Sequence, residues 1–407
     1  MNIGILIAQM ITSGGTQRTA LQVAEYLQQK GHQVTVYAYW YDRERCYPDI
    51  THNLNVRSVL NESCSPSSIV LRLLHPFQNR PLPLARLYWA FTLLEKIDPR
   101  TDILYGWDLN TQEALWAFKR RTGKPTLWCC PDLPPYFRVG YMEGFYDTLS
   151  PVKRLRFLVT DTFNKAVDHY VYMRGVDDIV VHVTKNANLV RQLLGRSAHV
   201  IYPAVDTCRF TPRPKPPRTG RPFRVASIAV FYRYRRFEDL IRAASILKNR
   251  GRTLEVTIGG YQESDPAYAA ELKVLAHSLG LNDTIHFHGA YSEPELREML
   301  YRTDVFVWCN HNQSWGTIVP EAIACGTPVI VSRTSGVSEI LEDGRHGLII
   351  PPLDPPALAD AIERLMDDPE LAQRLVSQAV AEVFPQVTLE RHCCRNLEVI
   401  ERMVKLL

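Results

Sequence analysis

Apolar and polar positions along the first half of the chain predict short buried strands separated by amphipathic helices. An apolar strand at 3–8 is followed by a glycine-containing loop and by a helix with apolar positions at Leu21, Ala24 and Leu27. The same criteria predict a helix at 111–123 and further strands at 32–40, 102–107, 125–130, 177–184 and 198–206. Alternation of this kind is typical of a doubly wound, mostly parallel α/β sheet.

The alternation starts again after a proline-rich and basic stretch, "TPRPKPPRTGRP", which is suited to neither a helix nor a central strand. Beyond it, the pattern predicts strands at 223–231, 254–260, 284–290, 304–310 and 328–332, and helices at 237–251, 267–281, 293–303, 320–326 and 356–368. We therefore predict an α/β protein with two Rossmann-like, doubly wound domains facing a cleft, divided into residues 1–210, a linker at 211–222, residues 223–385, and a final helix at 386–407 that crosses back to the first domain.

Composition narrows the function classes. A chain of 407 residues is too long for one ordinary core, and 46% hydrophobic with 22% charged residues is the profile of a globular protein. The net charge of +4 suits an anionic substrate or a membrane surface, and no basic arm for nucleic acid is present. Nine scattered cysteines without metal-site spacing, and no leader-like segment, indicate a reducing, cytoplasmic compartment. No run of about 18 apolar residues predicts a transmembrane helix.

The segment "QSWGTIVPEAIACGTPVIVS" (313–332) is the strongest candidate for chemistry. Pro320 suits the first turn of a helix, whose preceding amides attract anions and phosphates in particular. These amides belong to Gly316, Thr317, Ile318 and Val319. Glu321 lies in the same turn, where its carboxylate can accept two hydrogen bonds from a ribose diol. The simpler alternative is that Glu321 only complements the helix dipole.

This segment and "SGVSEILEDGRHGLIIPPLDPPALADAI" after it resemble the retaining glycosyltransferases of family 4, which have the GT-B fold and the pattern E-x7-E. "HVIYPAVDTCRFTP", "LGLNDTIHFHGAYSEPELREMLYRTDVFV" and "GGTQRTALQVAEYLQQKGHQVTVY" extend the resemblance over nearly the whole chain. The resemblance implies a GDP- or UDP-hexose donor held mainly by the second domain and a sugar or lipid-linked acceptor held mainly by the first, with no metal and no cofactor. Glu321 matches the ribose-binding Glu, and Trp315 lies in the loop that holds the donor.

Several positions depart from the family pattern. Gln313 replaces the first Glu of E-x7-E, which removes a negative charge near the developing positive charge of the anomeric carbon. Arg235 takes the place of the diphosphate-binding Lys, and Val230 that of the accompanying Arg, so that Arg233 or Arg236 would have to substitute for it. The simpler alternatives are a solvated glutamine and a solvated basic loop.

In the first domain, Gly14 and Gly15 would allow backbone to approach a phosphate or acceptor, which is compatible with their simply forming a tight turn. Asp132 takes the place of a family His near the sugar, and an Asx turn is the alternative. Apolar residues mixed with Arg and Lys at 66–96 and 152–159 would suit peripheral contact with the inner face of a membrane. We favour the ordinary alternative, amphipathic helices that face the core.

Together these features predict a metal-independent hexosyltransferase acting with retention, in which Asp132, Arg235 and Gln313 border the reacting sugar and its leaving group. One alternative is a catalytically impaired nucleotide-sugar-binding scaffold of the same fold, because three polar family positions have changed. A second is another enzyme on this fold, such as an epimerase or a phosphorylase. A phosphorylase using pyridoxal phosphate would need a cofactor lysine, for which the second domain offers no clear candidate.

Overall fold

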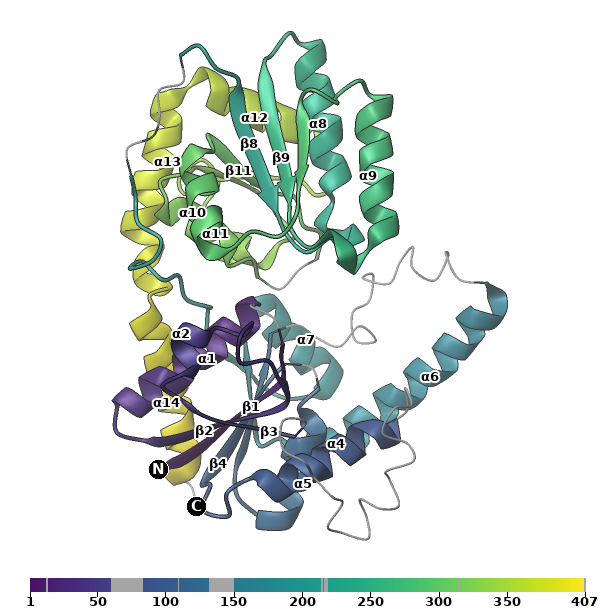
Figure 1. Cartoon of the computed structure of the whole chain (residues 1–407), viewed down its shortest axis with the longest axis vertical. Coiled ribbons are helices and arrows are strands. Elements are labelled where there is room, and N and C mark those ends of the chain that lie inside the picture. The colour runs from purple at the N-terminus through teal and green to yellow at the C-terminus, as the bar shows by residue number, and fades with distance from the viewer. Residues whose placement is uncertain are drawn as a thin grey trace. The chain divides into compact units, whose positions relative to one another are not determined.

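The chain forms two compact units, one of Met1–Tyr202 with Glu390–Leu407 and one of Pro203–Leu389 (Figure 1). The computed structural model describes residues 1–11, 14–59, 83–108, 110–131, 150–213, 215, 219–312 and 315–405, without the side chains of 83–86, 153, 156, 157, 160, 161 and 164.

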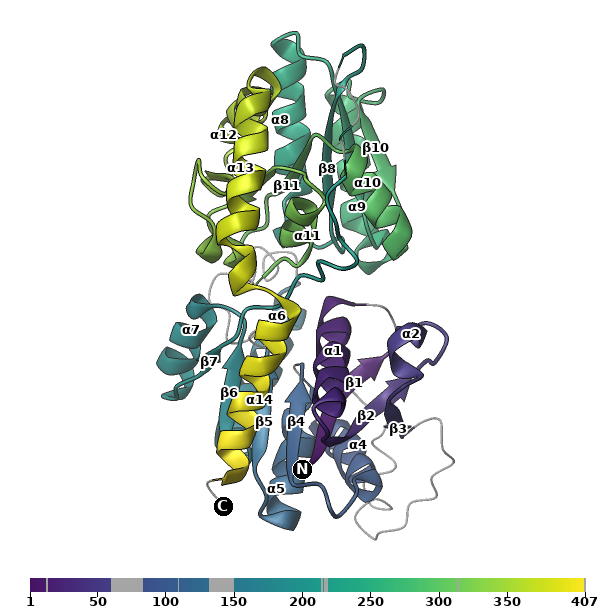
Figure 2. The ribbon, with the colours of Figure 1, turned by 90° about the vertical axis from the view of Figure 1, so that its left-hand side faces the viewer.

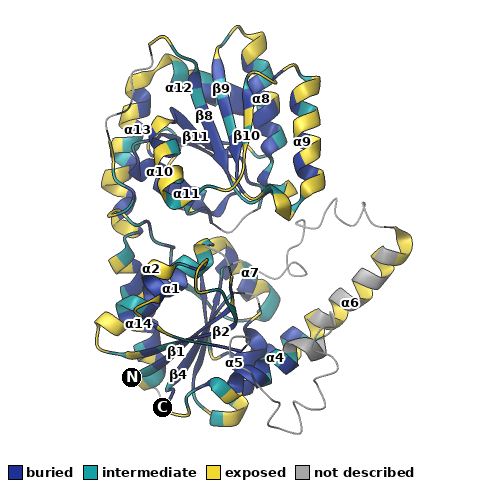
Figure 3. Cartoon of the chain, viewed as in Figure 1, coloured by how far each residue is buried: buried dark blue, intermediate teal, exposed yellow. Residues whose placement is uncertain are grey.

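The described part of the first unit is built on a seven-stranded sheet of order β3-β2-β1-β4-β5-β6-β7. All neighbouring strands are parallel. The strands are β1 (Asn2–Met10), β2 (Gln33–Tyr41), β3 (Asn55–Ser58), β4 (Ile103–Trp107), β5 (Thr126–Cys130), β6 (Asp178–Val181) and β7 (His199–Val200). The central strands are apolar on both faces because helices cover both sides of the sheet (Figure 3).

Helices of the first unit divide between the two faces. Side chains of α4 (Pro83–Lys96), α5 (Gln112–Thr122) and α7 (Thr184–Leu194) share one core with alternate strand residues such as Leu6 and Trp128. The remaining helices are α1 (Gly15–Gln29), α2 (Pro48–Thr51), α6 (Pro151–Tyr170) and α14 (Leu389–Lys405).

The C-terminal helix α14 packs on the first unit beside α1 (Figure 2). The Cys393 thiol lies 3.8 Å from the carbonyl oxygen of Gln22 in α1, and the Tyr105 hydroxyl of β4 donates to Asn396 Oδ1 at 2.6 Å. His392 of α14 contacts the Tyr202 carbonyl through Nδ1 at 2.7 Å. These buried polar contacts fix the register of α14 against the sheet, which apolar packing alone would not.

The second unit is built on a six-stranded sheet of order β10-β9-β8-β11-β12-β13, again parallel throughout. Its strands are β8 (Phe223–Ile228), β9 (Leu254–Gly259), β10 (Ile285–His288), β11 (Val305–Trp308), β12 (Val329–Ser332) and β13 (Leu348–Ile350). Its helices are α8 (Phe237–Asn249), α9 (Pro266–Ser278), α10 (Glu293–Arg302), α11 (Ile318–Ala324), α12 (Pro355–Asp367) and α13 (Pro369–Glu382).

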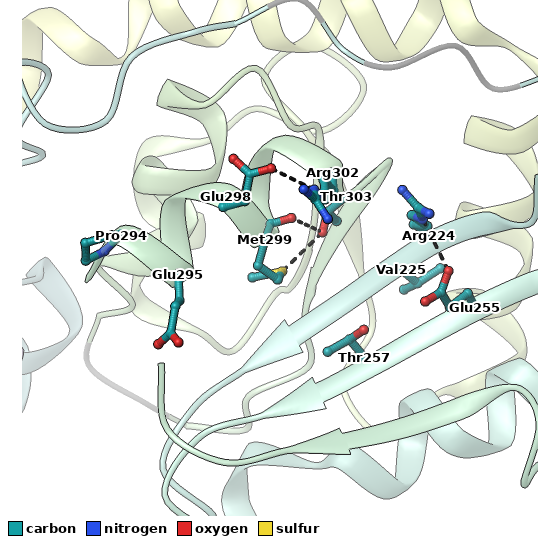
Figure 4. Close-up of a pocket in the computed structure, with 10 residues that line it drawn as sticks. All are labelled: Arg224, Val225, Glu255, Thr257, Pro294, Glu295, Glu298, Met299, Arg302 and Thr303. Carbon is teal, nitrogen blue, oxygen red and sulfur yellow. Dashed lines mark hydrogen bonds and ion pairs between the residues drawn. The ribbon is translucent and has the colours of Figure 1, made fainter. Parts of the chain in front are cut away.

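Alternate residues of β8 and β9 face opposite sides of this sheet. Val225 and Val256 join the core formed with α8, α9 and α12. Their neighbours Arg224, Glu255 and Thr257 face a hollow of about 520 Å³ beneath α10 (Figure 4). Four of the charged residues around the hollow form two pairs, since Arg224 contacts Glu255 at 3.2 Å and Arg302 contacts Glu298 at 2.7 Å. Glu295 instead accepts hydrogen bonds from the amide and hydroxyl of Ser292.

The proline-rich segment belongs to the second unit, so the boundary falls at Tyr202 and Pro203 instead of within 211–222. Lys215 Nζ donates to the carbonyl oxygens of Leu300 and Thr303, each at 2.9 Å. Arg221 makes a paired contact with the buried Asp304 at 2.6 and 2.9 Å. The composition of the segment excludes regular structure, but its basic side chains anchor it to one domain.

Candidate functional site

The glycine loop of the first unit lies at the carboxyl edge of its sheet, after β1. Gly14 is the N-cap of α1 and has extended backbone, with φ −96°. A Cβ there would lie 2.3 Å from Gln17 Oε1, while Gln17 Nε2 donates to the Gln9 carbonyl at 3.0 Å. Gly15 then begins α1, whose N-terminus points out of this edge. Gly14 and Gly15 thus form the extended N-cap and the first residue of α1, while residues 12 and 13 lie outside the described part of the chain.

In the second unit, the order of strands reverses between β8 and β11. Ligands of open parallel sheets bind at such a switch point, outside the carboxyl ends of the strands. The loops that follow β8 and β11 meet there, because the His311 amide donates to the Tyr234 carbonyl at 2.8 Å. Both candidate segments of the second domain thus occupy the edge at which this fold places its ligands.

Arg235 is buried at this edge, with 8% of its surface exposed. It ends a short 3₁₀ turn, Arg233–Arg235. Its guanidinium carbon lies 5.3 Å from the ring centre of Trp308 and 4.8 Å from that of Tyr234, within the range of a cation–π contact. Two aromatic rings therefore hold the guanidinium group in place.

Trp308, the last residue of β11, connects Arg235 to the loop before α11. A Cβ on Gly316 would lie 2.6 Å from Trp308 Nε1, so only glycine allows the loop to pass this close to the indole. Trp308 Nε1 donates to Ser335 Oγ at 3.0 Å, in the loop after β12. Arg235, Gly316 and Ser335 therefore gather around one indole, and we call these four residues the Trp308 cluster.

The loop after Gly316 leads directly into α11. Thr317 is its N-cap and makes no side-chain capping bond, and Trp315 is 4% exposed. The sequence predicts that the Val319 amide can bind a ligand. In the structure this amide donates to the Gly316 carbonyl at 3.0 Å and is therefore already engaged. Among the described residues, the amides of Gly316, Thr317 and Ile318 have no such acceptor.

Glu321 lies in the first turn of α11 and is only 3% exposed. Its own amide donates to the Thr317 carbonyl at 3.2 Å. Glu321 is thus a buried carboxylate in the loop-to-helix turn, at the edge where ligands of open parallel sheets bind.

The other two arginines of the basic loop are engaged elsewhere. Arg233 makes a bidentate contact with Glu271 of α9 at 2.7 and 2.8 Å, which lowers the pKa of that carboxyl. Arg236 contacts Asp239 at 2.8 and 3.1 Å and Glu238 at 2.6 Å. The structure therefore brings Arg235 to the Trp308 cluster and leaves Arg233 on the surface, paired with a carboxylate.

Of the other three positions that depart from the family pattern, Val230 lies among the described residues. Val230 is half-buried just after β8, where the preceding Ala229 is closely packed against Gly260. A Cβ on Gly260 would lie 1.8 Å from the Ala229 carbonyl oxygen. Gln313 and Asp132 lie outside the described residues.

Sequence reasoning missed Trp308 and Ser335. Trp308 reads as one more apolar residue of a buried strand, and Ser335 as an ordinary loop serine. A signal for Trp308 does exist, because it ends the strand directly before the candidate loop, at the edge where ligands bind.

Comparison with known proteins agrees with this architecture. A model described as Glycosyltransferase Family 4 matches residues 13–209, and one described as Glycosyl transferases group 1 matches residues 209–381. The D-inositol 3-phosphate glycosyltransferase of Thermomonospora curvata is 28% identical over 286 residues, which are 65% of this chain and 63% of that relative. The alpha-D-kanosaminyltransferase of Streptomyces kanamyceticus is 32% identical over 142 residues, 35% of this chain and 36% of the relative. Both matches span less than two thirds of the relative's length.

Solved structures share the fold over the full chain. Alr3699/HepE of Anabaena, solved in complex with UDP and glucose, has a TM-score of 0.75 at 16% identity. The match covers 99% of this chain and 100% of the HepE chain. Sucrose-phosphate synthase of Thermosynechococcus elongatus has a TM-score of 0.74 at 18% identity, with both chains fully covered. The fold is thus GT-B, and the chain belongs to the group 1 glycosyltransferases with an N-terminal domain of glycosyltransferase family 4.

Proposed function

We propose that this protein is a retaining glycosyltransferase that moves a hexose from a GDP- or UDP-linked donor to a sugar or lipid-linked acceptor, without a metal ion or a cofactor. The observation that carries the proposal is the Trp308 cluster. It holds a buried arginine at the switch point of the second sheet, beside the loop that leads to Glu321. Family membership supports the general reaction.

The chemistry assigned to the cluster is electrostatic. In the transfer, the oxygen of an acceptor hydroxyl forms a bond to the anomeric carbon and loses its proton, and the bond from that carbon to phosphate breaks with its electron pair on the diphosphate. The products are the glycoside, the nucleoside diphosphate and the released proton. Arg235 and the amides of Gly316, Thr317 and Ile318 would stabilise that growing negative charge. Glu321 would accept hydrogen bonds from the ribose of the same nucleotide. Fixed donors of this kind need no rearrangement during the reaction.

Two alanine variants in the same loop test this assignment. Arg235→Ala should lower the rate of nucleoside diphosphate release about 100-fold or more, because it removes the cation nearest the leaving group. Arg233→Ala removes an equal charge two residues away, but one already paired with Glu271, and should change the rate less than twofold. Equal effects of the two variants, at equal thermal stability, would contradict the role of the cluster.

The donor and the acceptor are narrowed by the relatives and neighbours. Alr3699/HepE was solved with UDP, which supports a uridine donor and puts UDP-hexoses first in a screen before GDP-hexoses. Several relatives are named D-inositol 3-phosphate glycosyltransferases, which makes a phosphorylated cyclitol the first acceptor to test beside simple sugars. Both remain part of the proposal.

One observation favours an impaired, nucleotide-sugar-binding scaffold as the second candidate. Val230 occupies the family's arginine position and is half-buried after β8, and both neighbouring arginines are paired with carboxylates. The diphosphate would therefore meet one arginine where the family offers two cations. Thermal stabilisation by a nucleotide without release of product, across all donors and acceptors, would support this candidate instead.

A peripheral contact with a membrane is the remaining part of the proposal, and α6 supports it. The favoured expectation for 152–159, a helix face turned to the core, is wrong for the side chains described there (Figure 3). Val152, Leu155, Val159 and Phe163 are 78%, 65%, 63% and 57% exposed. By contrast, α4 buries Leu93 and Leu94 in the core. This agrees with the core-facing helix that we favoured for the segment 66–96, of which residues 66–82 lie outside the described residues.

An exposed apolar stripe at helical spacing, on a helix whose first half has basic but no acidic residues, suits the surface of an anionic bilayer. Within the described residues, no helix combines the length and the apolar character that crossing a bilayer requires. A cytoplasmic location stays a prediction.

Vesicle sedimentation tests the membrane contact. Leu155→Glu with Val159→Glu should abolish binding to vesicles that contain phosphatidylglycerol. Val274→Glu is a matched control, because Val274 is 67% exposed on α9 of the other domain. Wild-type protein that fails to sediment with these vesicles, or a double variant that still does, would remove this part of the proposal.

A further inference from the structure

Asp108 follows β4 at the carboxyl edge of the first sheet, next to β1. The strand order of the first unit reverses between β1 and β4, so this edge is the counterpart, in the first domain, of the edge that carries the Trp308 cluster. Sequence reasoning ended the strand at Trp107 and did not single out the next residue. Position alone makes Asp108 a candidate for contact with a ligand.

The backbone of Asp108 is held in the left-handed region, with φ 86°. This conformation is unfavourable for residues with a side chain, and it persists only where the surroundings impose it. Here the Asp108 amide donates to the Cys129 carbonyl at 3.3 Å, and its carbonyl accepts from Trp128 Nε1 at 2.8 Å and from Thr111 Oγ1 at 3.1 Å. Neighbours on two sides therefore fix the direction of the carboxyl group.

The carboxyl group is turned back toward β1. Oδ2 accepts the Ala8 amide at 3.2 Å, and Oδ1 accepts the Asn110 amide at 3.0 Å. Each oxygen of a carboxylate has two lone pairs, so each retains capacity for a further donor. The backbone bonds orient the group without saturating it.

The charge of Asp108 is poorly compensated. The residue is half-buried, and burial raises the pKa of its carboxyl to about 7, against the lowering by the two backbone amides. Among the described residues, no Lys, Arg or His side chain contributes to the pKa of this carboxyl. A desolvated carboxylate without a counter-cation gains most from additional neutral hydrogen-bond donors, and the hydroxyl groups of a sugar or cyclitol are such donors.

We propose that Asp108 is the acceptor-binding carboxylate of the first domain, which accepts hydrogen bonds from hydroxyl groups of a polyhydroxylated acceptor held at the β1–β4 edge. This inference rests on the proposed function and adds to it the residue that recognises the acceptor. Asp108 binds the acceptor; it is not assigned a step in bond formation.

The chain offers a matched control on the same two strands. Asp102 precedes β4 at the opposite, amino edge of the sheet, and its Oδ2 accepts the Asn2 amide of β1 at 2.8 Å. Asp102→Asn thus removes an equivalent carboxylate–backbone contact where no ligand is expected. Asp108→Asn removes the charge with little change in volume, and Asp108→Gly removes the side chain while relieving the left-handed backbone.

The experiment measures KM for acceptor and donor separately. The acceptor probes are methyl α-D-mannopyranoside, methyl α-D-glucopyranoside and D-inositol 3-phosphate, and turnover is read as nucleoside diphosphate release from UDP- and GDP-hexoses. Both Asp108 variants should raise the acceptor KM by about tenfold to a hundredfold, because each removes one charge-assisted hydrogen bond to the acceptor. The donor KM and the nucleotide affinity should stay at wild-type values. Asp102→Asn should leave all three unchanged.

The inference is overturned if the Asp108 variants have acceptor KM values within twofold of those of Asp102→Asn. It is also overturned if they lose donor affinity as much as acceptor affinity, because that would indicate a merely structural role. If the wild-type protein releases nothing from any donor, the proposed function fails separately. Saturation-transfer NMR with the acceptor probes alone then decides: a signal lost in both Asp108 variants supports the inference, and an unchanged or absent signal contradicts it.

Discussion

Replacing Gly316 by alanine tests the geometry of the Trp308 cluster quantitatively. The added Cβ would lie 2.6, 2.7 and 2.9 Å from three atoms of the Trp308 indole. Ordinary contacts begin at 3.4 Å, so the closest atom must move by the difference, 0.8 Å. The indole cannot move freely, because its Nε1 donates to Ser335 and its face lies against Arg235.

The expected magnitude follows from these contacts. Overpacking a buried site costs about 1–3 kcal/mol, and the weakened bond to Ser335 adds about 0.5–1.5 kcal/mol. We expect the unfolding free energy of the second domain to fall by about 2–4 kcal/mol. Displacing the indole also displaces Arg235, so the affinity for UDP or GDP should fall by about tenfold to a hundredfold.

Urea unfolding and titration calorimetry with both nucleotides measure the two effects. Gly289→Ala is the matched control, because Gly289 also follows a strand of this sheet and a Cβ there would meet nothing within 4 Å. If Gly316→Ala matches Gly289→Ala in both measurements, the packing of Gly316 on Trp308 is wrong, and with it the placement of Arg235.

Two further predictions concern α14 and its buried polar contacts. Asn396→Ala removes the partner of the buried Tyr105 hydroxyl and should lower the free energy of unfolding in urea by about 2–4 kcal/mol. Proteolysis of the C-terminal helix should also become faster. A variant as resistant to protease as the wild type would contradict the contact. Burial lowers the pKa of His182 to about 3 and of His392 to about 4, so both are neutral in the fold and take up protons on unfolding. Their stabilisation is complete above about pH 6.5, the ordinary histidine pKa, and is lost progressively as pH falls toward 4. His392→Gln should flatten this part of the stability profile, and an unchanged profile would contradict it.

Hydrophobic periodicity was sufficient to predict most of the regular structure. The strand expected at 102–107 is β4 (Ile103–Trp107), and the helix expected at 356–368 is α12 (Pro355–Asp367). The strand expected at 177–184 ends earlier, at Val181, because His182 and Val183 lead into α7, which begins at Thr184. A continuous apolar run does not mark where a buried strand passes into a helix.

The candidate site was predicted less completely, for reasons that are visible in its contacts. Position in the family pattern singles out Arg235 among the three arginines of the loop, but the sequence does not show which of them are paired. Arg233 pairs with Glu271, 38 residues away, and Arg236 pairs with Asp239. Arg235 differs from both through Trp308, which the sequence presents as a core residue. Asp108 was missed because its left-handed backbone depends on hydrogen bonds from other elements.

The central claim is that the second domain binds a nucleotide-diphosphate hexose for transfer, with Glu321 on its ribose. The most direct test compares nucleoside diphosphate release from UDP- and GDP-hexoses by wild-type protein and by Glu321→Ala, with folding verified by thermal unfolding. The account predicts release from donors of one base, reduced at least about tenfold in the variant by the loss of charge-assisted hydrogen bonds. Nucleotide binding without release, or release that the variant leaves intact, would contradict it.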